Sequence, residues 1–209
     1  MKKIALNLSL VLATAFMLAS CNSKTAETAE ETTVDSSAVE NVYTINTDAS
    51  SKVEWKGEML KMYSHSGTLA FKEGSLTTKG GALTAGTFTV DLTTITPTDS
   101  NYDKKDRTAA NLVGHLSSPD FFDVANHPTA TFVINSVNGN EATGTLTIRG
   151  KSNEETIKNI VINETDGAIS ATGTLTFDRQ KYDVAFKMSV KDMVLSDDIT
   201  LNVTLTGTK

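Results

Sequence analysis

The chain of 209 residues contains one cysteine, Cys21, so a disulfide bond within the chain is excluded. The folded part must therefore be stabilised by its hydrophobic core alone. Beyond residue 18 the sequence also lacks an apolar run of the roughly 20 residues that a membrane-spanning helix requires. The length that remains is ample for one domain with a sizeable core.

An excess of basic residues is missing as well, since 19 lysines and arginines stand against 25 aspartates and glutamates. The net charge is −6, and it becomes −8 for residues 21–209 once Lys2 and Lys3 are left out. Phosphate backbones are bound by clustered basic side chains, so we expect no nucleic-acid partner. The acidic balance mainly implies solubility.

The sequence contains no G-x-S-x-G, P-loop or dinucleotide-binding pattern. The three histidines are His65, His115 and His127. Their spacing matches no zinc motif, and we expect them to make structural hydrogen bonds. Asp99 lies in a Pro-Thr-Asp-Ser turn, so turn capping is favoured over an acid–base pair with Asp91. Asp178 and Arg179 are expected to pair at a strand end.

The first twenty residues have the layout of a secretory signal. Two lysines precede an apolar run over residues 4–18, and small residues follow at 19 and 20. We therefore predict a signal peptide over residues 1–20. The sequence LASC at residues 18–21 resembles the bacterial lipobox, in which the cysteine is acylated and becomes the mature N-terminus. The alternative is an ordinary signal peptide followed by a chance cysteine.

We expect acyl chains on Cys21 to anchor the protein, with its domain in the aqueous space outside the cytoplasm. Asn22 differs from the aspartate that retains some lipoproteins at the inner membrane, which favours the outer membrane. Whether the domain faces the periplasm or the cell exterior stays open. Residues 21–41 have almost no large apolar side chains, and we predict a disordered acidic tether there. The domain is predicted over residues 42–209.

From residue 42 the pattern changes to an alternation of apolar and polar side chains. It is clear over residues 53–59, 68–71, 87–92, 129–134, 145–149, 169–177 and 199–205. A period of two is typical of strands with one apolar face. Short turns such as Asn138-Gly139 and Asp166-Gly167 indicate antiparallel hairpins. Further strands are expected at residues 157–162 and 184–190.

Residues 103–116 lack this alternation and contain helix formers with aspartate near the start. We predict one short helix there, followed by a loop that carries Phe121 and Phe122. About eight to ten antiparallel strands with one helix fit either a sandwich or a barrel. Glycines inside strands, at positions 57, 67, 86, 144 and 173, indicate bends or close backbone approach and favour a barrel. An up-and-down barrel of about eight strands can hold one small ligand.

Several motifs follow one another in a recognisable order. They are YTI at 43–45, VEWK at 53–56, HSGTLAF at 65–71, TVDLTTI at 89–95, HLSSPDFFD at 115–123, HPTATF at 127–132 and GTLTIRG at 144–150. Together they resemble the YceI-like family of periplasmic lipid-binding proteins. The sequence departs from the family after Gly150, where a threonine-lysine-proline turn is more common, and the segment before His65 is short.

The resemblance implies an all-β, lipocalin-like extended antiparallel barrel. Because the sequence shows no catalytic constellation, we expect no enzymatic activity and no cofactor. Such barrels enclose an apolar channel for a polyisoprenoid, an isoprenoid quinone or a fatty amide. A lipid site needs inward apolar area, which core packing needs equally. The candidate lining residues are Trp55, Leu69, Phe71, Leu83, Phe88, Phe121, Phe122, Phe132, Ile148, Leu175, Phe177 and Phe186. Phe121 and Phe122 are interpreted as a plug beneath the helix or as a lid over the channel.

The leading hypothesis is a membrane-tethered, non-enzymatic binding module for a long apolar lipid. Storage, transport and protection of the lipid all stay open. One alternative is a structural surface lipoprotein whose barrel is filled by its own side chains. Another is a hydrolase or isomerase of a hydrophobic substrate that uses the histidines. An exposed edge strand would allow a homodimer.

Overall fold

The computed structural model describes residues 38–60, 62–103, 105, 107–186 and 194–209. The predicted signal peptide, Cys21 and most of the predicted tether lie outside the described residues. Within the described ranges, no helix has the length and apolar character needed to cross a membrane.

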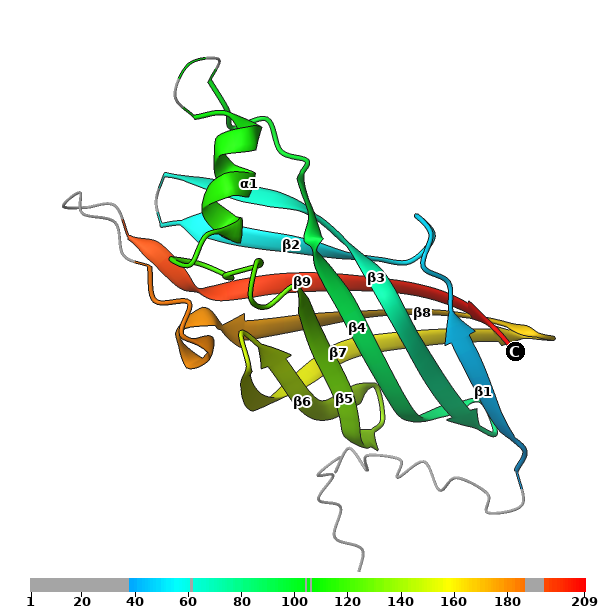
Figure 1. Cartoon of the computed structure of the whole chain (residues 1–209). Helices are drawn as coiled ribbons and strands as arrows, with labels where there is room; N and C mark the ends of the chain where they lie inside the picture. The colour runs from blue at the N-terminus through cyan, green and yellow to red at the C-terminus, as the bar shows by residue number, and fades with distance from the viewer. Residues whose placement is uncertain (1–37, 61, 104, 106, 187–193) are drawn as a thin grey trace, which may run out of the picture. The chain divides into compact units, whose positions relative to one another are not determined.

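In this part of the chain, nine strands, one α-helix and one 3-10 helix follow one another. They are β1 (Glu40–Ile45), β2 (Lys52–Met59), β3 (Tyr63–Lys79), β4 (Ala82–Pro97), α1 (Ala109–Ser117), β5 (Thr129–Asn138), β6 (Glu141–Ile148), β7 (Lys151–Thr165), β8 (Ala168–Asp178), η1 (Arg179–Tyr182) and β9 (Leu195–Thr208). Neighbouring strands pair antiparallel in the order β1-β3-β2-β9-β8-β7-β6-β5-β4, and β4 pairs back onto β3 (Figure 1). The sheet is therefore a closed barrel, which confirms the predicted fold class.

Strands β1 and β2 together fill one position in the barrel wall. Along β3, strand β1 pairs from Glu40↔Lys79 to Thr44↔Ser75, and β2 continues from Lys52↔Ala70 to Met59↔Tyr63. Both also pair with β9 on their other side. The nine strands thus make an eight-membered wall, with the loop at residues 46–51 interrupting one member.

Alternation of side chains explains why these segments form the wall. In β6 and β8, buried positions alternate with positions that face solvent, as a strand with one apolar face requires. The buried side chains of all the strands meet inside the barrel as one core. The strand expected at residues 157–162 lies within the longer β7.

Two glycines mark places where the backbone passes too close to its neighbours for a side chain. A Cβ atom at Gly67 would lie 2.3 Å from the Thr96 carbonyl oxygen and 2.5 Å from the Trp55 ring. At Gly144 it would lie 2.4 Å from the Val133 carbonyl oxygen. The close approach predicted from these glycines is confirmed.

The helix begins later than predicted. Its first residue is Ala109, and the Thr108 side chain accepts a hydrogen bond from the Asn111 amide as N-cap. Asp103 instead accepts hydrogen bonds from the amides of Lys105 and Arg107, at 2.9 and 3.0 Å. An aspartate that binds nearby amides holds the chain in a turn, so the predicted helical start at residue 103 is wrong.

Two predictions near η1 are also wrong. Residues 184–186 form no strand, because the Val184 carbonyl accepts a hydrogen bond from the Arg179 guanidinium instead of from a neighbouring strand. Residues 187–190 of that predicted strand lie outside the described part. Arg179 forms its ion pair with Asp197, at 2.9 Å, whereas Asp178 caps the Gln180 amide.

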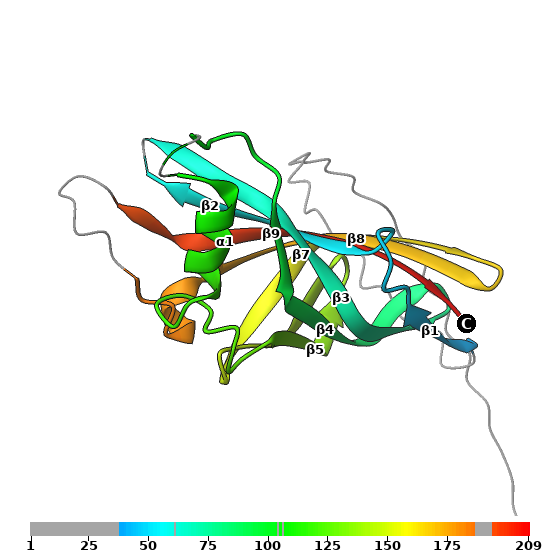
Figure 2. The ribbon, with the colours of Figure 1, turned by 45° about the horizontal axis from the view of Figure 1, so that its top comes forward.

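Helix α1 lies across the end of the barrel where β2 turns into β3 and where β9 begins (Figure 2). On the flank of α1 the wall is short, because β4 and β5 share only the pairs from Thr87↔Val133 to Asp91↔Thr129. Beyond this ladder, the Leu92 amide donates to the carbonyl of Pro128, in the segment that leads back from α1. The helix and its flanking segments therefore cover a gap that the strands leave.

Candidate functional site

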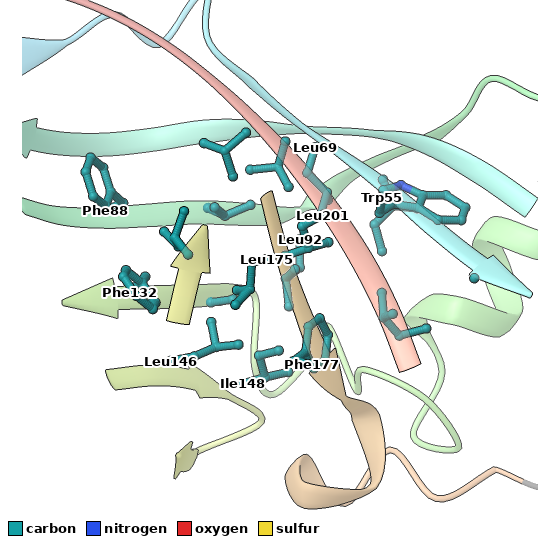
Figure 3. A pocket seen from close by; sticks show the side chains of 18 of the residues that line it. Trp55, Leu69, Phe88, Leu92, Phe132, Leu146, Ile148, Leu175, Phe177 and Leu201 are labelled. Carbon is teal, nitrogen blue, oxygen red and sulfur yellow. The ribbon is translucent and has the colours of Figure 1, made fainter. Parts of the chain in front are cut away.

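The barrel encloses a cavity of about 620 Å³. Leucine, isoleucine, valine and phenylalanine side chains from all parts of the wall dominate its lining (Figure 3). A volume of this order is in the range of pockets that bury most of a small-molecule ligand. The core is therefore only partly filled by the protein's own side chains.

All twelve lining residues predicted from the sequence border this cavity. Seven of them come from the wall and are buried, namely Phe71, Leu83, Phe88, Phe132, Ile148, Leu175 and Phe177. Trp55 and Leu69 are partly exposed and come from β2 and β3, and Trp55 lies toward the α1 end (Figure 3). Phe121, Phe122 and Phe186 come from the segments around α1. That these side chains contact a ligand stays a prediction.

Other lining residues were not singled out from the sequence. Val53, Leu92, Leu146 and Leu201 lie within the alternating segments recognised in the sequence, on the same face as the predicted lining residues, so the alternation itself identifies them. Leu112 of α1 and Met62 of the β2–β3 turn also line the cavity, although no strand pattern includes them. Their contribution depends on how α1 and the turn fold over the barrel end.

Aromatic side chains pack together beneath α1. The ring of His115 lies 4.9 Å from that of Phe121 and 4.5 Å from that of Phe186, each edge to face. Phe121 is buried, and Arg149 donates hydrogen bonds to the carbonyl oxygens of Phe121 and Asp183. Phe121 thus packs under the helix as the plug interpretation requires, while a lid role for Phe122 stays a prediction.

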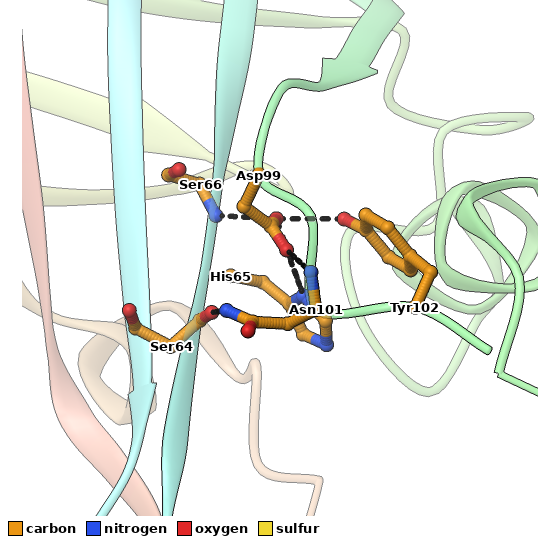
Figure 4. Close-up of polar contacts among 6 residues, drawn as sticks. All are labelled: Ser64, His65, Ser66, Asp99, Asn101 and Tyr102. Atoms are coloured by element: carbon orange, nitrogen blue, oxygen red, sulfur yellow. Dashed lines mark hydrogen bonds and ion pairs between the residues drawn. The ribbon is translucent and has the colours of Figure 1, made fainter.

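A polar cluster at the same end joins β3 to the segment before α1 (Figure 4). The Asp99 carboxylate accepts hydrogen bonds from the Tyr102 hydroxyl at 2.7 Å and from the amides of Ser66 and Asn101 at 3.0 and 2.9 Å. It also lies 3.1 Å from His65 Nδ1. Turn capping by Asp99 is therefore confirmed.

Hydrogen bonding decides the ionisation of this cluster. Burial raises the pKa of Asp99, but the hydrogen bonds from Tyr102, Ser66, Asn101 and His65 outweigh it and lower the pKa to about 2. The pKa of Tyr102 is raised, first by burial and then by its hydrogen bond to Asp99. Asp99 is thus a carboxylate at neutral pH, and it accepts hydrogen bonds without donating any.

The opposite end of the barrel is crossed by a second polar cluster. Glu164 of β7 accepts hydrogen bonds from Asn41 and Tyr43 of β1 and from Thr78 of β3. Tyr43 and Thr78 are completely buried. The hydrogen bond from Tyr43 is the largest cause that lowers the pKa of Glu164, and burial followed by Glu164 raises the pKa of Tyr43 to about 12. This end is closed around an ionised carboxylate.

Histidine and carboxylate side chains do not gather anywhere in the described residues into a group of three that could hold a metal ion. Asp91 accepts hydrogen bonds from the amide and the hydroxyl of Thr93, where the register between β3 and β4 shifts.

Comparisons with known proteins agree with this architecture. Among solved structures, BcnA of Burkholderia cenocepacia has a TM-score of 0.59 and 22% identity, covering 78% of this chain and all of its own. A polyisoprenoid-binding domain from Saccharophagus degradans has a TM-score of 0.52 and 12% identity, covering 79% of this chain and 97% of its own. At these identities the likeness shows the fold alone.

Curated relatives match over shorter stretches. A UPF0312 protein of Staphylococcus epidermidis is 32% identical over 104 residues, which are 47% of this chain and 58% of the relative. A UPF0312 protein of Staphylococcus aureus is 36% identical over 85 residues, or 37% of this chain and 48% of the relative. The chain thus spans about half the length of the curated relatives it matches.

The family model for the YceI-like domain matches residues 43–207, which include every strand but the first residues of β1 and the last of β9. This match takes in every residue of the cavity lining and both polar clusters apart from Asn41. The chain belongs to the YceI-like domain family, as its ordered motifs predicted.

Proposed function

We propose that this protein is a non-enzymatic carrier that holds one long apolar lipid inside its barrel while anchored to a membrane through Cys21. The enclosed cavity of about 620 Å³, lined almost wholly by apolar side chains, carries this proposal. The lipid classes that fit are polyisoprenoids, isoprenoid quinones and fatty amides. The polyisoprenoid-binding description of the Saccharophagus degradans domain supports the same class of ligand.

Apolar burial alone supplies enough free energy for such a complex. Burying about 300 Å² of ligand surface at about 25 cal/mol per Å² gives about 7.5 kcal/mol before the costs of association. No charged contact is required for binding of this strength. Selectivity among chains would then follow from the length and bend of the cavity.

The anchor gives the carrier access to its ligand. Acylation of Cys21, together with the predicted tether that leads to β1, would keep the barrel close to the membrane and raise its effective concentration at the lipid source. We place the protein in the cell envelope, on the outer membrane, facing the periplasm or the exterior. Homodimerisation stays a prediction.

The catalytic alternative is less well supported. His65 is bonded to Asp99, His115 packs against phenylalanine rings, and His127 lies outside the cavity lining. The three do not share a hydrogen-bonded cluster in the described structure. The filled-barrel alternative conflicts with the cavity volume.

Native mass spectrometry of residues 32–209, which include every residue that the structure describes, tests the proposal after expression in a bacterial periplasm. We expect a stoichiometric adduct with the mass of an isoprenoid or fatty derivative, removable by solvent extraction. Leu201→Trp, which fills the cavity, should lose the adduct. Val161→Trp, on the exposed face of β7, should keep it. Bare protein that also refuses an added isoprenoid quinone after extraction would refute a lipid carrier.

A further inference from the structure

The polar side chains of the cavity lining are distributed unevenly. Among the described lining residues, those with an ionisable side chain are Tyr63, His65, Arg107 and His115. All four come from the start of β3, from α1 or from the segment before it, and so lie at one end. No described aspartate or glutamate lines the cavity. The α1 end therefore gathers the ionisable side chains of the lining, whereas the remaining wall offers hydrocarbon apart from the hydroxyl groups of Thr131 and Thr172.

His65 is held in one orientation at this end. Because the Asp99 carboxylate can only accept, the proton of the His65–Asp99 hydrogen bond resides on His65 Nδ1. The imidazole also stacks on Tyr102, with centroids 5.1 Å apart, and meets the edge of Tyr63 at 5.2 Å. Its Nε2 atom has no hydrogen-bond partner among the residues that the structure describes. The ring is thus built into the wall with one nitrogen left for a ligand.

Arg107 supplies further unused donors beside it. Its Nε donates to Asp103 at 2.9 Å, and that hydrogen bond is the largest cause raising the pKa of Arg107, with Tyr63 close enough to add to the effect. Its terminal amino groups have no partner in the described part of the chain. A guanidinium fork of this kind matches the geometry of a carboxylate or phosphate.

Trp55 adds an N–H group next to His65. The two residues occupy diagonal positions on paired strands, because Trp55 is opposite Gly67 and His65 is opposite Gly57. The Trp55 Nε1 atom is buried and, alone among the described buried side-chain nitrogens and oxygens, has no partner. Buried polar groups of native proteins are normally bonded, so an acceptor is missing here.

The carboxylates at the two ends also differ in role. At the α1 end Asp99 and Asp103 lie beside His65 and Arg107 and are bonded to them. At the far end the ionised Glu164 accepts hydrogen bonds from the neutral side chains of Asn41, Tyr43 and Thr78, and Lys209 is the basic side chain that acts on it, by lowering its pKa. An acidic group on the ligand is therefore favoured at the α1 end, where the ionisable side chains of the lining lie.

We propose that the α1 end is a head-group subsite where Arg107 and His65 bind the oxyanion of an acidic lipid, a phosphate or a carboxylate, whose chain extends toward Glu164. The subsite rests on the proposed carrier function and narrows its ligand to an amphipathic lipid with an oxyanion head. Arg107 and His65 are then the residues that select the head group, and the apolar wall selects the chain.

Paired probes that differ only in the head test this subsite on delipidated residues 32–209. Farnesol and farnesyl phosphate share one chain, and methyl palmitate and palmitate form the carboxylate pair. Binding is followed below micelle concentrations by fluorescence of Trp55, the only tryptophan in the chain, and by calorimetry. We expect each acidic probe to bind about tenfold more tightly than its neutral partner. A preference confined to one pair identifies phosphate or carboxylate as the head.

Arg107→Gln and His65→Gln should each reduce the ratio of the affinity for the acidic probe to the affinity for its neutral partner. The double variant should bring this ratio close to one and leave the affinity for farnesol unchanged. Lys105→Gln and His127→Gln, which alter side chains outside the cavity lining, are the matched controls. Arg107 is two-thirds exposed, so its replacement leaves folding intact even where His65→Gln does not. Equal binding of both heads by the unaltered protein, or a preference that survives Arg107→Gln, overturns the subsite alone. Failure to bind any of the four probes overturns the carrier function as well.

Discussion

At the scale of single residues, hydrogen-bonded carboxylates carry much of what distinguishes this barrel from a plain hydrocarbon core. Asp99 gathers four donors from β3 and from the segment before α1. The sequence indicated a turn at Asp99 but gave no sign of His65, because 34 residues separate the two. Short-range capping can be predicted from residue type. A partner that strand register brings close, such as His65, cannot be predicted from residue type.

Asp99 should make stability depend on pH in the acid range. Its pKa falls from 3.8 in the unfolded chain to about 2 in the fold, so its contribution is complete above about pH 4 and is lost as pH falls toward 2. We expect the free energy of unfolding to decrease over this window by less in Asp99→Asn than in the unaltered protein. Urea unfolding at several pH values measures the difference, and parallel pH profiles would contradict it.

Two glycines offer a matched pair for testing backbone crowding. Gly144→Ala places a Cβ 2.4 Å from the Val133 carbonyl and 2.6 Å from the Phe132 ring, so we expect it to destabilise the fold by about 1–3 kcal/mol. Gly114 lies in α1 with nothing within 4 Å of the added atom. Gly114→Ala should therefore stabilise by about 0.5–1 kcal/mol. Thermal unfolding measures the stability change of each variant. A shift of the melting temperature in the same direction in both variants would refute the crowding at Gly144.

At the scale of elements, period-two patterns identified most strands but not their partners. The alternation over residues 169–177 lies within β8, and that over residues 199–205 within β9. Strands β1 and β2 share one place in the wall because they pair with successive parts of β3. No local sequence pattern encodes this register. The late start of α1 follows from a choice between two capping residues, Asp103 and Thr108, which composition alone leaves undecided.

Arg149 should control the mobility of the segment between α1 and β5. Its guanidinium holds the carbonyls of Phe121 and Asp183 together, so Arg149→Gln removes two anchors of the aromatic plug. We expect faster amide hydrogen exchange over residues 118–124 and faster ligand release. Lys151→Gln is the control, since it breaks only the exposed Lys151–Asp183 ion pair and should change little. Unchanged exchange in Arg149→Gln would show that aromatic packing alone holds the plug.

At the scale of the whole molecule, the barrel has two chemically different ends. The inward apolar face, and hence all twelve predicted lining residues, could be found from alternation and family motifs. The polar cluster at the closed end could not be predicted, because 121 residues of sequence separate Glu164 from Tyr43, which donates a hydrogen bond to it. Long-range polar pairs of this kind form only when the barrel closes, so they produce no periodic pattern in the sequence.

Glu164 should stabilise the closed barrel as a unit, since it ties β7 to β1 and β3. Glu164→Gln weakens three hydrogen bonds to a charged acceptor, and we expect a loss of about 1–3 kcal/mol. Because the pKa of Glu164 is lowered by folding, its contribution is present above its unfolded pKa and disappears as pH falls through the folded one. Chemical unfolding at neutral and acid pH measures both effects. Glu154→Gln, on the exposed face of the same strand, should leave stability unchanged.

The short ladder between β4 and β5 gives the wall a seam. Five residue pairs join these strands, whereas eleven join β8 and β9, so the wall parts there at the lowest cost in backbone hydrogen bonds. Beside this seam the covering segment around α1 is held mainly by side chains. A hydrocarbon chain would therefore enter laterally between β4 and β5, while the longer ladders keep their backbone hydrogen bonds. Loading would then cost a brief undocking of the helix and leave the remainder of the sheet intact.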